Sequence, residues 1–224
     1  MTNANGFFFE RDERLFLVTS RHVVLDEASS HRPNRLEIEL HVDPENVAVT
    51  AQFAVPLYQE NKPLWREGVD AGGAIDVAAI ELERSSLPQT ISLHSFNSAH
   101  LVEELDQIEV ATRVLVVGFP LGFHDTVHHL PVVRQAVVAS AFGIRFQRLG
   151  YFLTDAHLHR GTSGAPLVAR MSPSESGRGK LPWMLLGVHA ARMDTTNRDA
   201  ELDERLNLNC AWYADILTTL TEEL

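Results

Sequence analysis

The sequence predicts an all-β protein, either a barrel or a sandwich, and three observations lead to this prediction. Short apolar or alternating runs recur along the chain, with turn residues between them. Several of the runs are rich in Val, Ile and Phe, which favours strands over helices. No long stretch repeats its apolar residues at the helical period, so helices do not supply the framework.

The clearest strand signal lies at Leu36–Val42, where the apolar residues fall at every second position, as in a strand with one buried face. Apolar runs of similar length predict further strands at Leu15–Thr19, Val47–Val55, Ile75–Leu82, Val114–Phe119, Val132–Ser140, Tyr151–Thr154, Ala165–Ala169, Met184–Ala190 and Leu206–Trp212.

Two segments depart from the strand pattern. Val23–Ala28 is predicted to form a helical turn. Tyr213–Leu224 places Ile216, Leu217 and Leu220 at helical spacing, which predicts a short helix at the C-terminal end.

Composition excludes two classes of partner. The formal net charge of −11 argues against nucleic-acid binding, because contact with phosphates needs a basic surface. The longest uncharged apolar stretch, Val114–Phe123, is interrupted by glycine and proline and is far shorter than the roughly 20 residues that span a bilayer. We therefore expect neither nucleic acid nor a membrane as a partner.

The single cysteine and the first residues bear on the compartment. Cys210 has no second cysteine with which to form an intrachain disulfide, which favours a reducing environment. The charged run Glu10–Arg14 directly follows Phe7–Phe9, and no signal-peptide core tolerates such a run. We expect a cytoplasmic protein.

The stretch from Arg160 to Val168 carries the strongest chemical signal. Glycines on either side of Thr162 and Ser163 allow a tight turn that brings backbone N–H groups together. The side chain of a serine in such a turn is accessible from solvent, and the backbone N–H of the same serine faces a developing oxyanion. An ordinary glycine turn is the alternative. The α/β-hydrolase elbow is disfavoured, because it needs Gly-x-Ser-x-Gly before a helix, whereas here Gly164 follows Ser163 directly.

A serine nucleophile needs an imidazole to take its proton and a carboxylate to orient the imidazole. His22 follows directly after an expected strand, and Asp76 lies within another, where its apolar neighbours predict that it is buried. A buried carboxylate without a partner is costly. Asp76 is therefore expected to have an imidazolium or an equivalent donor beside it.

Three motifs carry the histidine, the aspartate and the serine, in that order along the chain. They are Thr-x-x-His-Val-Val at 19–24, Ile-Asp-Val-Ala at 75–78 and Gly-x-Ser-Gly-x-Pro at 161–166. They resemble the trypsin-like (chymotrypsin-fold, PA clan) serine peptidases of bacterial type, over nearly the whole chain. The resemblance implies two six-stranded antiparallel β-barrels with a short C-terminal α-helix. We expect the barrels at 1–95 and 96–212 and the helix at 213–224, together one trypsin-like peptidase domain.

The resemblance also implies an activity and its residues. The protein would be a serine endopeptidase that acts on a protein or peptide through an acyl-enzyme, with no cofactor and no metal. Ser163 would be the nucleophile, His22 the general base and then acid, and Asp76 the residue that orients His22. The backbone amides of Gly161 and Ser163 would form the oxyanion hole.

Specificity rests on weaker signals. Gly-Val-His at 187–189 is similar to the Gly-Ile-His of glutamate-specific bacterial enzymes, which implies that His189, with Arg192, favours an acidic residue before the scissile bond. A strand histidine satisfied by backbone groups is the alternative. His157 stands where trypsin carries its aspartate, which disfavours a basic preference, although the nearby Asp155 keeps that preference open. A preference for a small or apolar residue before the scissile bond is a further alternative.

His124, His128 and His129 are grouped in a way that suggests a metal site. They lack His-Glu-x-x-His spacing and have no cysteine cluster near them. Pro120, Gly122 and Pro131 mark the segment as a loop between strands, and we interpret the histidines as part of a solvated loop.

The chain departs from the family in one respect that matters. Trypsin frees an Ile-Val amino terminus that forms an internal ion pair, and no Ile-Val-Gly start exists here. The oxyanion loop must then be held by other means. Two rivals to a general protease remain: a non-catalytic binding or sensor module, and a highly selective protease that acts with a partner subunit or a fused domain in a larger assembly.

Overall fold

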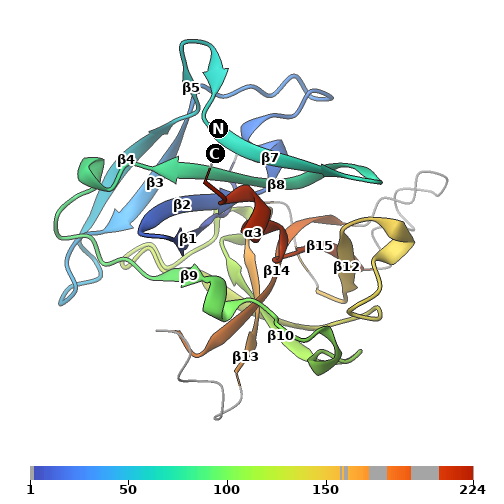
Figure 1. The fold of residues 1–224 in the computed structure, drawn as a ribbon. Helices are drawn as coiled ribbons and strands as arrows, with labels where there is room; N and C mark the ends of the chain where they lie inside the picture. The colour runs from blue at the N-terminus through green and yellow to red at the C-terminus, as the bar shows by residue number, and fades with distance from the viewer. Residues whose placement is uncertain (1–2, 157, 159–160, 172–180, 193–206, 224) are drawn as a thin grey trace.

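The strands of the computed structural model form two main sheets, one in each half of the molecule (Figure 1). The N-terminal sheet has the strand order β7-β8-β2-β1-β9, and the C-terminal sheet has the order β11-β10-β13-β14-β15-β12. The structure describes residues 3–156, 158, 161–171, 181–192 and 207–223, without the side chains of residues 191 and 192. The prediction of an all-β fold is confirmed.

The N-terminal half contains the first sheet and two separate hairpins. The sheet strands are β1 (Phe7–Arg11), β2 (Arg14–Thr19), β7 (Trp65–Asp70), β8 (Gly73–Leu82) and β9 (Ser95–Asn97). The hairpins are β3 (Arg35–His41) with β4 (Thr50–Pro56), and β5 (Tyr58–Gln59) with β6 (Lys62–Pro63). This sheet has five strands where a six-stranded antiparallel barrel was expected, because β3 and β4 pair only with each other. One of its strand pairs, β1 with β9, is parallel.

The C-terminal half is one antiparallel sheet. Its strands are β10 (Arg113–Gly118), β11 (Val132–Val137), β12 (Tyr151–Thr154), β13 (Pro166–Arg170), β14 (Trp183–Arg192) and β15 (Asn209–Tyr213).

Helical structure is limited to short segments. The α-helices are α1 (Arg21–Val24) and α3 (Ile216–Leu220), and the 3-10 turns are η1 (Arg84–Ser86), η2 (Ser98–His100), η3 (Leu105–Gln107), η4 (Pro120–Gly122) and η5 (Phe146–Arg148). α3 is shorter than the segment 213–224 predicted from its spacing, because Tyr213 still pairs with Gly187 in the sheet. No helix in the described part of the chain is long and apolar enough to cross a membrane.

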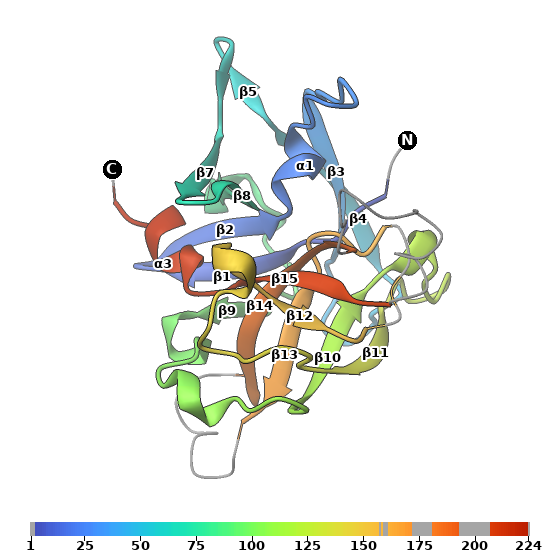
Figure 2. The same ribbon diagram turned by 90° about the vertical axis from the view of Figure 1, so that its right-hand side faces the viewer.

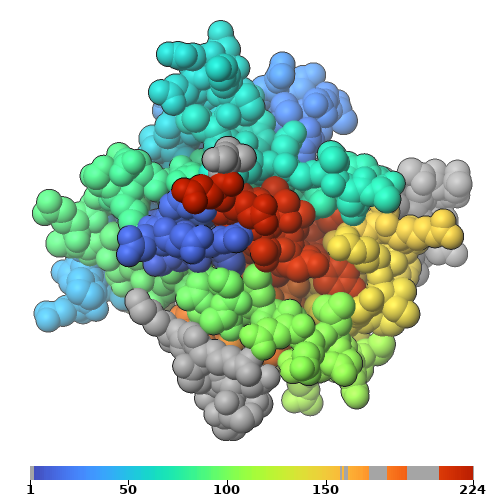
Figure 3. Space-filling model, in the orientation of Figure 1, coloured from blue at the N-terminus to red at the C-terminus, as the bar shows by residue number. Residues whose placement is uncertain are grey.

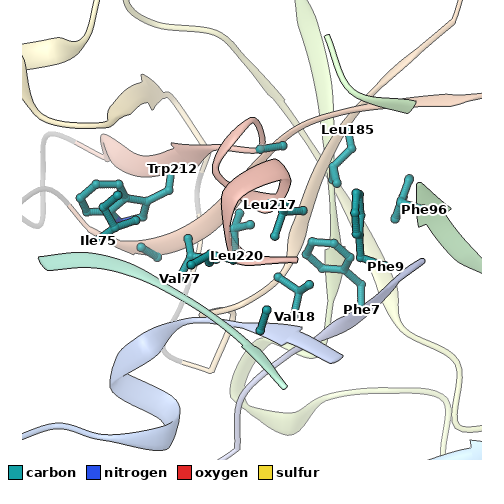
Figure 4. Close-up of a cluster of buried hydrophobic side chains, with 14 of the residues drawn as sticks. Phe7, Phe9, Val18, Ile75, Val77, Phe96, Leu185, Trp212, Leu217 and Leu220 are labelled. Atoms are coloured by element: carbon teal, nitrogen blue, oxygen red, sulfur yellow. The ribbon is translucent and has the colours of Figure 1, made fainter. Parts of the chain in front are cut away.

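Three clusters of buried side chains correspond to the two halves and the interface between them. One cluster lies within the N-terminal half and a second within the C-terminal half. The third joins β1, β2 and β8 to β14, β15 and α3 (Figure 4). Its central members include Phe9, Val18, Leu185, Trp212 and Leu217. Burying each such side chain contributes about 2 kcal/mol, so the third cluster holds the two halves together.

The last segment of the chain ties the halves from outside. α3 packs against β7 and β8, and in the space-filling view it lies between the N-terminal strands and the C-terminal half (Figures 2 and 3). The carbonyls at a helix end lack partners within the helix. Arginines from the N-terminal sheet donate to carbonyls here: Arg11 to Thr218, Arg14 to Thr221 and Glu222, and Arg66 to Glu222.

Candidate active site

His22 and Asp76 meet because their strands are neighbours. β2 and β8 are antiparallel, with Thr19 opposite Ala78. His22 lies just beyond the end of β2, in α1, and Asp76 lies on β8. The backbone N–H of His22 donates to Asp76 Oδ1 at 2.9 Å, and His22 Nδ1 is 2.7 Å from Asp76 Oδ2. The carboxylate thus fixes both the backbone and the ring of His22.

The electrostatics of this pair favour a basic imidazole. Burial by itself would lower the pKa of His22, but the hydrogen bond and the charge of Asp76, together with the charge of Asp26, raise that pKa above its usual value. With Nδ1 directed at Asp76, Nε2 is the nitrogen that can accept a proton. The Asp76 side chain is 25% exposed, so it is less buried than its apolar neighbours in the sequence predict.

Ser163 lies in a turn between β12 and β13 that two glycines make possible. Gly161 and Gly164 have φ values of 88° and 85°, in the left-handed region that favours glycine. A Cβ at Gly164 would lie 2.1 Å from the Asn5 carbonyl oxygen. The turn is closed by a hydrogen bond from Ala165 N–H to the Thr162 carbonyl, at 3.0 Å.

The segments that carry Ser163 and His22 meet at one carbonyl, that of His189. It accepts a hydrogen bond from Gly164 N–H at 2.8 Å and another from the Ser20 hydroxyl at 3.2 Å. The Ser163 hydroxyl itself donates to the Ala190 carbonyl at 2.8 Å. Among the described residues, no hydrogen bond joins Ser163 to His22.

The His189 side chain is buried and neutral. It is 2% exposed, and burial, with the nearby His22, lowers its pKa to about 3. Its Nδ1 has no hydrogen-bond partner in the described part of the chain. The backbone of His189 is hydrogen-bonded on both sides, since its N–H donates to the Ala165 carbonyl at 2.9 Å. His157 and the side chain of Arg192, the other predicted specificity groups, lie outside the described residues.

Asn5 is the residue of this site that the sequence did not indicate. It is 6% exposed, and four hydrogen bonds attach it to three distant segments. Its side-chain amide donates to the Gly161 carbonyl and accepts from Phe119 N–H at 2.7 Å. Its backbone N–H donates to the Ser163 carbonyl at 2.8 Å, and its own carbonyl accepts from the Thr19 hydroxyl at 2.6 Å.

The histidine-rich loop between β10 and β11 is attached to the β3–β4 hairpin. His41 Nε2 lies 2.7 Å from the His128 carbonyl, and His128 Nδ1 lies 2.7 Å from Asp125 Oδ2. His124 Nδ1 contacts the Gly122 carbonyl at 2.7 Å. Within the described residues, no group of three or more His, Cys, Asp or Glu side chains is arranged to hold a metal ion.

Solved structures with a similar fold include an inactivated protease paralogue and a heparin binding protein. The scabies mite inactivated protease paralogue S-I1 is 17% identical, with a TM-score of 0.56 over 96% of this chain and 85% of that chain. A mutant of human heparin binding protein is 14% identical, with a TM-score of 0.50 over 91% and 79% of the two chains. These likenesses show the fold, and they confirm the all-β two-barrel architecture.

Sequence comparison gives the family. No curated protein has a matching sequence. The family model described as the trypsin-like peptidase domain matches residues 4–172, which include the serine turn, His22 and Asp76. By this match, the chain belongs to the trypsin-like peptidase family.

Proposed function

We propose that the protein is a serine endopeptidase that uses Ser163, His22 and Asp76 as a catalytic triad. The observation that carries the proposal is the double contact of Asp76 with the backbone and ring of His22. The glycine turn that holds Ser163 is joined to the His22 segment through the His189 carbonyl. A solvated surface histidine would not need both contacts. The contacts hold the ring with Nε2 as the proton acceptor, which is what a serine nucleophile requires.

The reaction would follow from these positions. His22 Nε2 takes the proton of Ser163 as Oγ bonds to the carbonyl carbon of the scissile peptide bond. The N–H groups of Gly161 and Ser163 stabilise the oxyanion that develops. His22 then gives its proton to the leaving nitrogen as the C–N bond breaks, and water releases the acyl group by the same steps in reverse.

One observation favours a partner-activated form of this module. The Ser163 hydroxyl donates to the Ala190 carbonyl at 2.8 Å, so its proton is engaged there and not with His22. Attack requires the side chain to rotate and to exchange this hydrogen bond for one with His22. A partner or substrate that favours the rotated form would switch the site on, and without it the domain would act only as a binding or sensor module.

Fluorophosphonate labelling tests the proposal directly. The wild-type protein should be labelled, Ser163→Ala should not, and Ser98→Ala, which changes an exposed serine in η2, should label like the wild type. No labelling of a folded wild-type protein would contradict a constitutive protease and support the module. Labelling that appears only after a cell extract is added would support activation by a partner.

The substrate class is a finer part of the proposal. A protein or peptide with an acidic residue before the scissile bond needs a cation or a hydrogen-bond donor in the pocket. His189 is neutral by itself, so an incoming carboxylate must either raise its pKa or accept an N–H from the neutral ring. A peptide-library cleavage profile should then show Glu enriched at this position, most strongly below neutral pH. A profile without Glu or Asp enrichment would end the acidic-pocket hypothesis.

A further inference from the structure

The carbonyls of the serine turn all point at fixed partners. The Gly161 carbonyl accepts from the Asn5 side chain, the Thr162 carbonyl from Ala165 N–H, and the Ser163 carbonyl from Asn5 N–H. A planar peptide unit directs its C=O and its N–H to opposite sides. Fixing three successive carbonyls therefore fixes the direction of the N–H groups between them, including that of Ser163.

Two of these three peptide units depend on one residue. Asn5 is bonded to the Gly161 carbonyl through its side chain and to the Ser163 carbonyl through its backbone. The third unit is held within the turn itself. Glycine at 161 has no side chain to restrict its own rotation, so an outside partner is needed to hold it.

Asn5 can act in this way because it is itself held firmly. Its side-chain oxygen accepts from Phe119 N–H, and its carbonyl accepts from the Thr19 hydroxyl. A Cβ at Gly118 would lie 2.6 Å from the Asn5 side-chain oxygen, and a Cβ at Gly164 would lie 2.1 Å from its carbonyl oxygen. The chain thus leaves space for Asn5 on two sides by having glycine there.

We propose that Asn5 is a positioning residue that holds the oxyanion-binding turn in its catalytic shape. The inference rests on the proposed protease function and names a structural support for it just before the first strand. Among the described residues, its hydrogen bonds go to backbone groups and the Thr19 hydroxyl, and none goes to the side chain of Ser163 or His22. Its two contacts with the turn hold the peptide units on either side of the one that carries the Ser163 N–H.

The rate of fluorophosphonate labelling is the test, measured on the full chain over a range of pH. Asn5→Ala removes both side-chain hydrogen bonds. Asn5→Asp keeps the size and the acceptor for Phe119 but places a carboxylate oxygen against the Gly161 carbonyl. Both variants should label about 100-fold more slowly than the wild type at the pH plateau, because a small misplacement of the turn weakens transition-state stabilisation.

The midpoint of the pH profile separates positioning from a general loss of structure. It should stay where the wild type has it, because the contacts between His22 and Asp76 are untouched. Asn97→Ala is the matched control: Asn97 also bonds a backbone N–H through its side chain, that of Ala99 at 3.1 Å, but in η2. This variant should label within about twofold of the wild type, because it lies outside the serine turn.

Hydrogen exchange keeps the inference testable apart from activity. Amides of residues 163–165 should exchange faster in Asn5→Ala than in the wild type, relative to amides of β8. If the wild type does not label even after a cell extract is added, the proposed function fails, and the exchange result still decides the role of Asn5. Folded Asn5→Ala and Asn5→Asp variants that label at the wild-type rate, or an unchanged exchange rate in the turn, would overturn the inference.

Discussion

Acid should destabilise this protein through His189, and His189→Gln should remove that part of the effect. The folded state keeps the buried ring neutral and lowers its pKa to about 3, whereas a histidine in the unfolded chain titrates near about 6.5. Between these values the unfolded state binds more protons, so the free energy of unfolding falls as the pH falls. From about pH 7.5 to about pH 5, the loss due to this one residue is about 2 kcal/mol.

Urea unfolding at the two pH values measures this difference. The wild type should lose about 2 kcal/mol more than His189→Gln between them. Any loss of packing in the variant is present at both pH values and cancels from the comparison. His94→Gln, which changes an exposed histidine, is the control and should keep the wild-type dependence. Equal losses in the wild type and His189→Gln would refute the burial argument.

Three further predictions concern the turn, the helix and the base. Gly164→Ala should cost about 3 kcal/mol or more in urea unfolding, because the new Cβ would overlap the Asn5 carbonyl in a left-handed backbone; a variant as stable as the wild type would contradict the close approach of Asn5 to this turn. Arg14→Ala should lower the free energy of unfolding by about 2 kcal/mol in the same assay, since the Arg14 guanidinium donates to carbonyls just after α3. An unchanged free energy of unfolding would mean that water replaces these hydrogen bonds. The labelling rate should fall on acidification with a midpoint above about 6.5, set by His22, and Asp76→Asn should lower that midpoint.

Most strands could be predicted from the sequence because their apolar residues are grouped. β2, β8, β10 and β12 begin and end within one or two residues of the predicted runs. β7 was missed, because its residues between Trp65 and Asp70 are mostly polar and Val69 is exposed. β9 was missed because it contains a single buried apolar residue, Phe96. β1 was also missed, although Phe7 and Phe9 are buried, because its apolar run is only three residues long and charged residues follow it directly.

The candidate site divides in the same way. His22 and Asp76 could be paired in advance, since each stands in a local motif and a half-buried carboxylate needs a donor. The role of Asn5 could not be predicted from a local motif. Its side-chain partners, Gly161 and Phe119, lie 156 and 114 residues away, and a single asparagine before a strand has no pattern of its own. The neutral state of His189 also depends on burial, which only the fold determines.

The two histidines at the site should respond to acid in a fixed order. His22, beside Asp76, holds its proton more tightly than an ordinary histidine, whereas the buried His189 resists protonation. On acidification His22 is therefore protonated first, while the His189 carbonyl still holds Gly164 and Ser20 in place. The cost of about 2 kcal/mol near pH 5 is smaller than the total stability of about 5–15 kcal/mol typical of such domains. Labelling should thus be lost near pH 5 in a protein that is still folded, and it should return in full when the pH is raised.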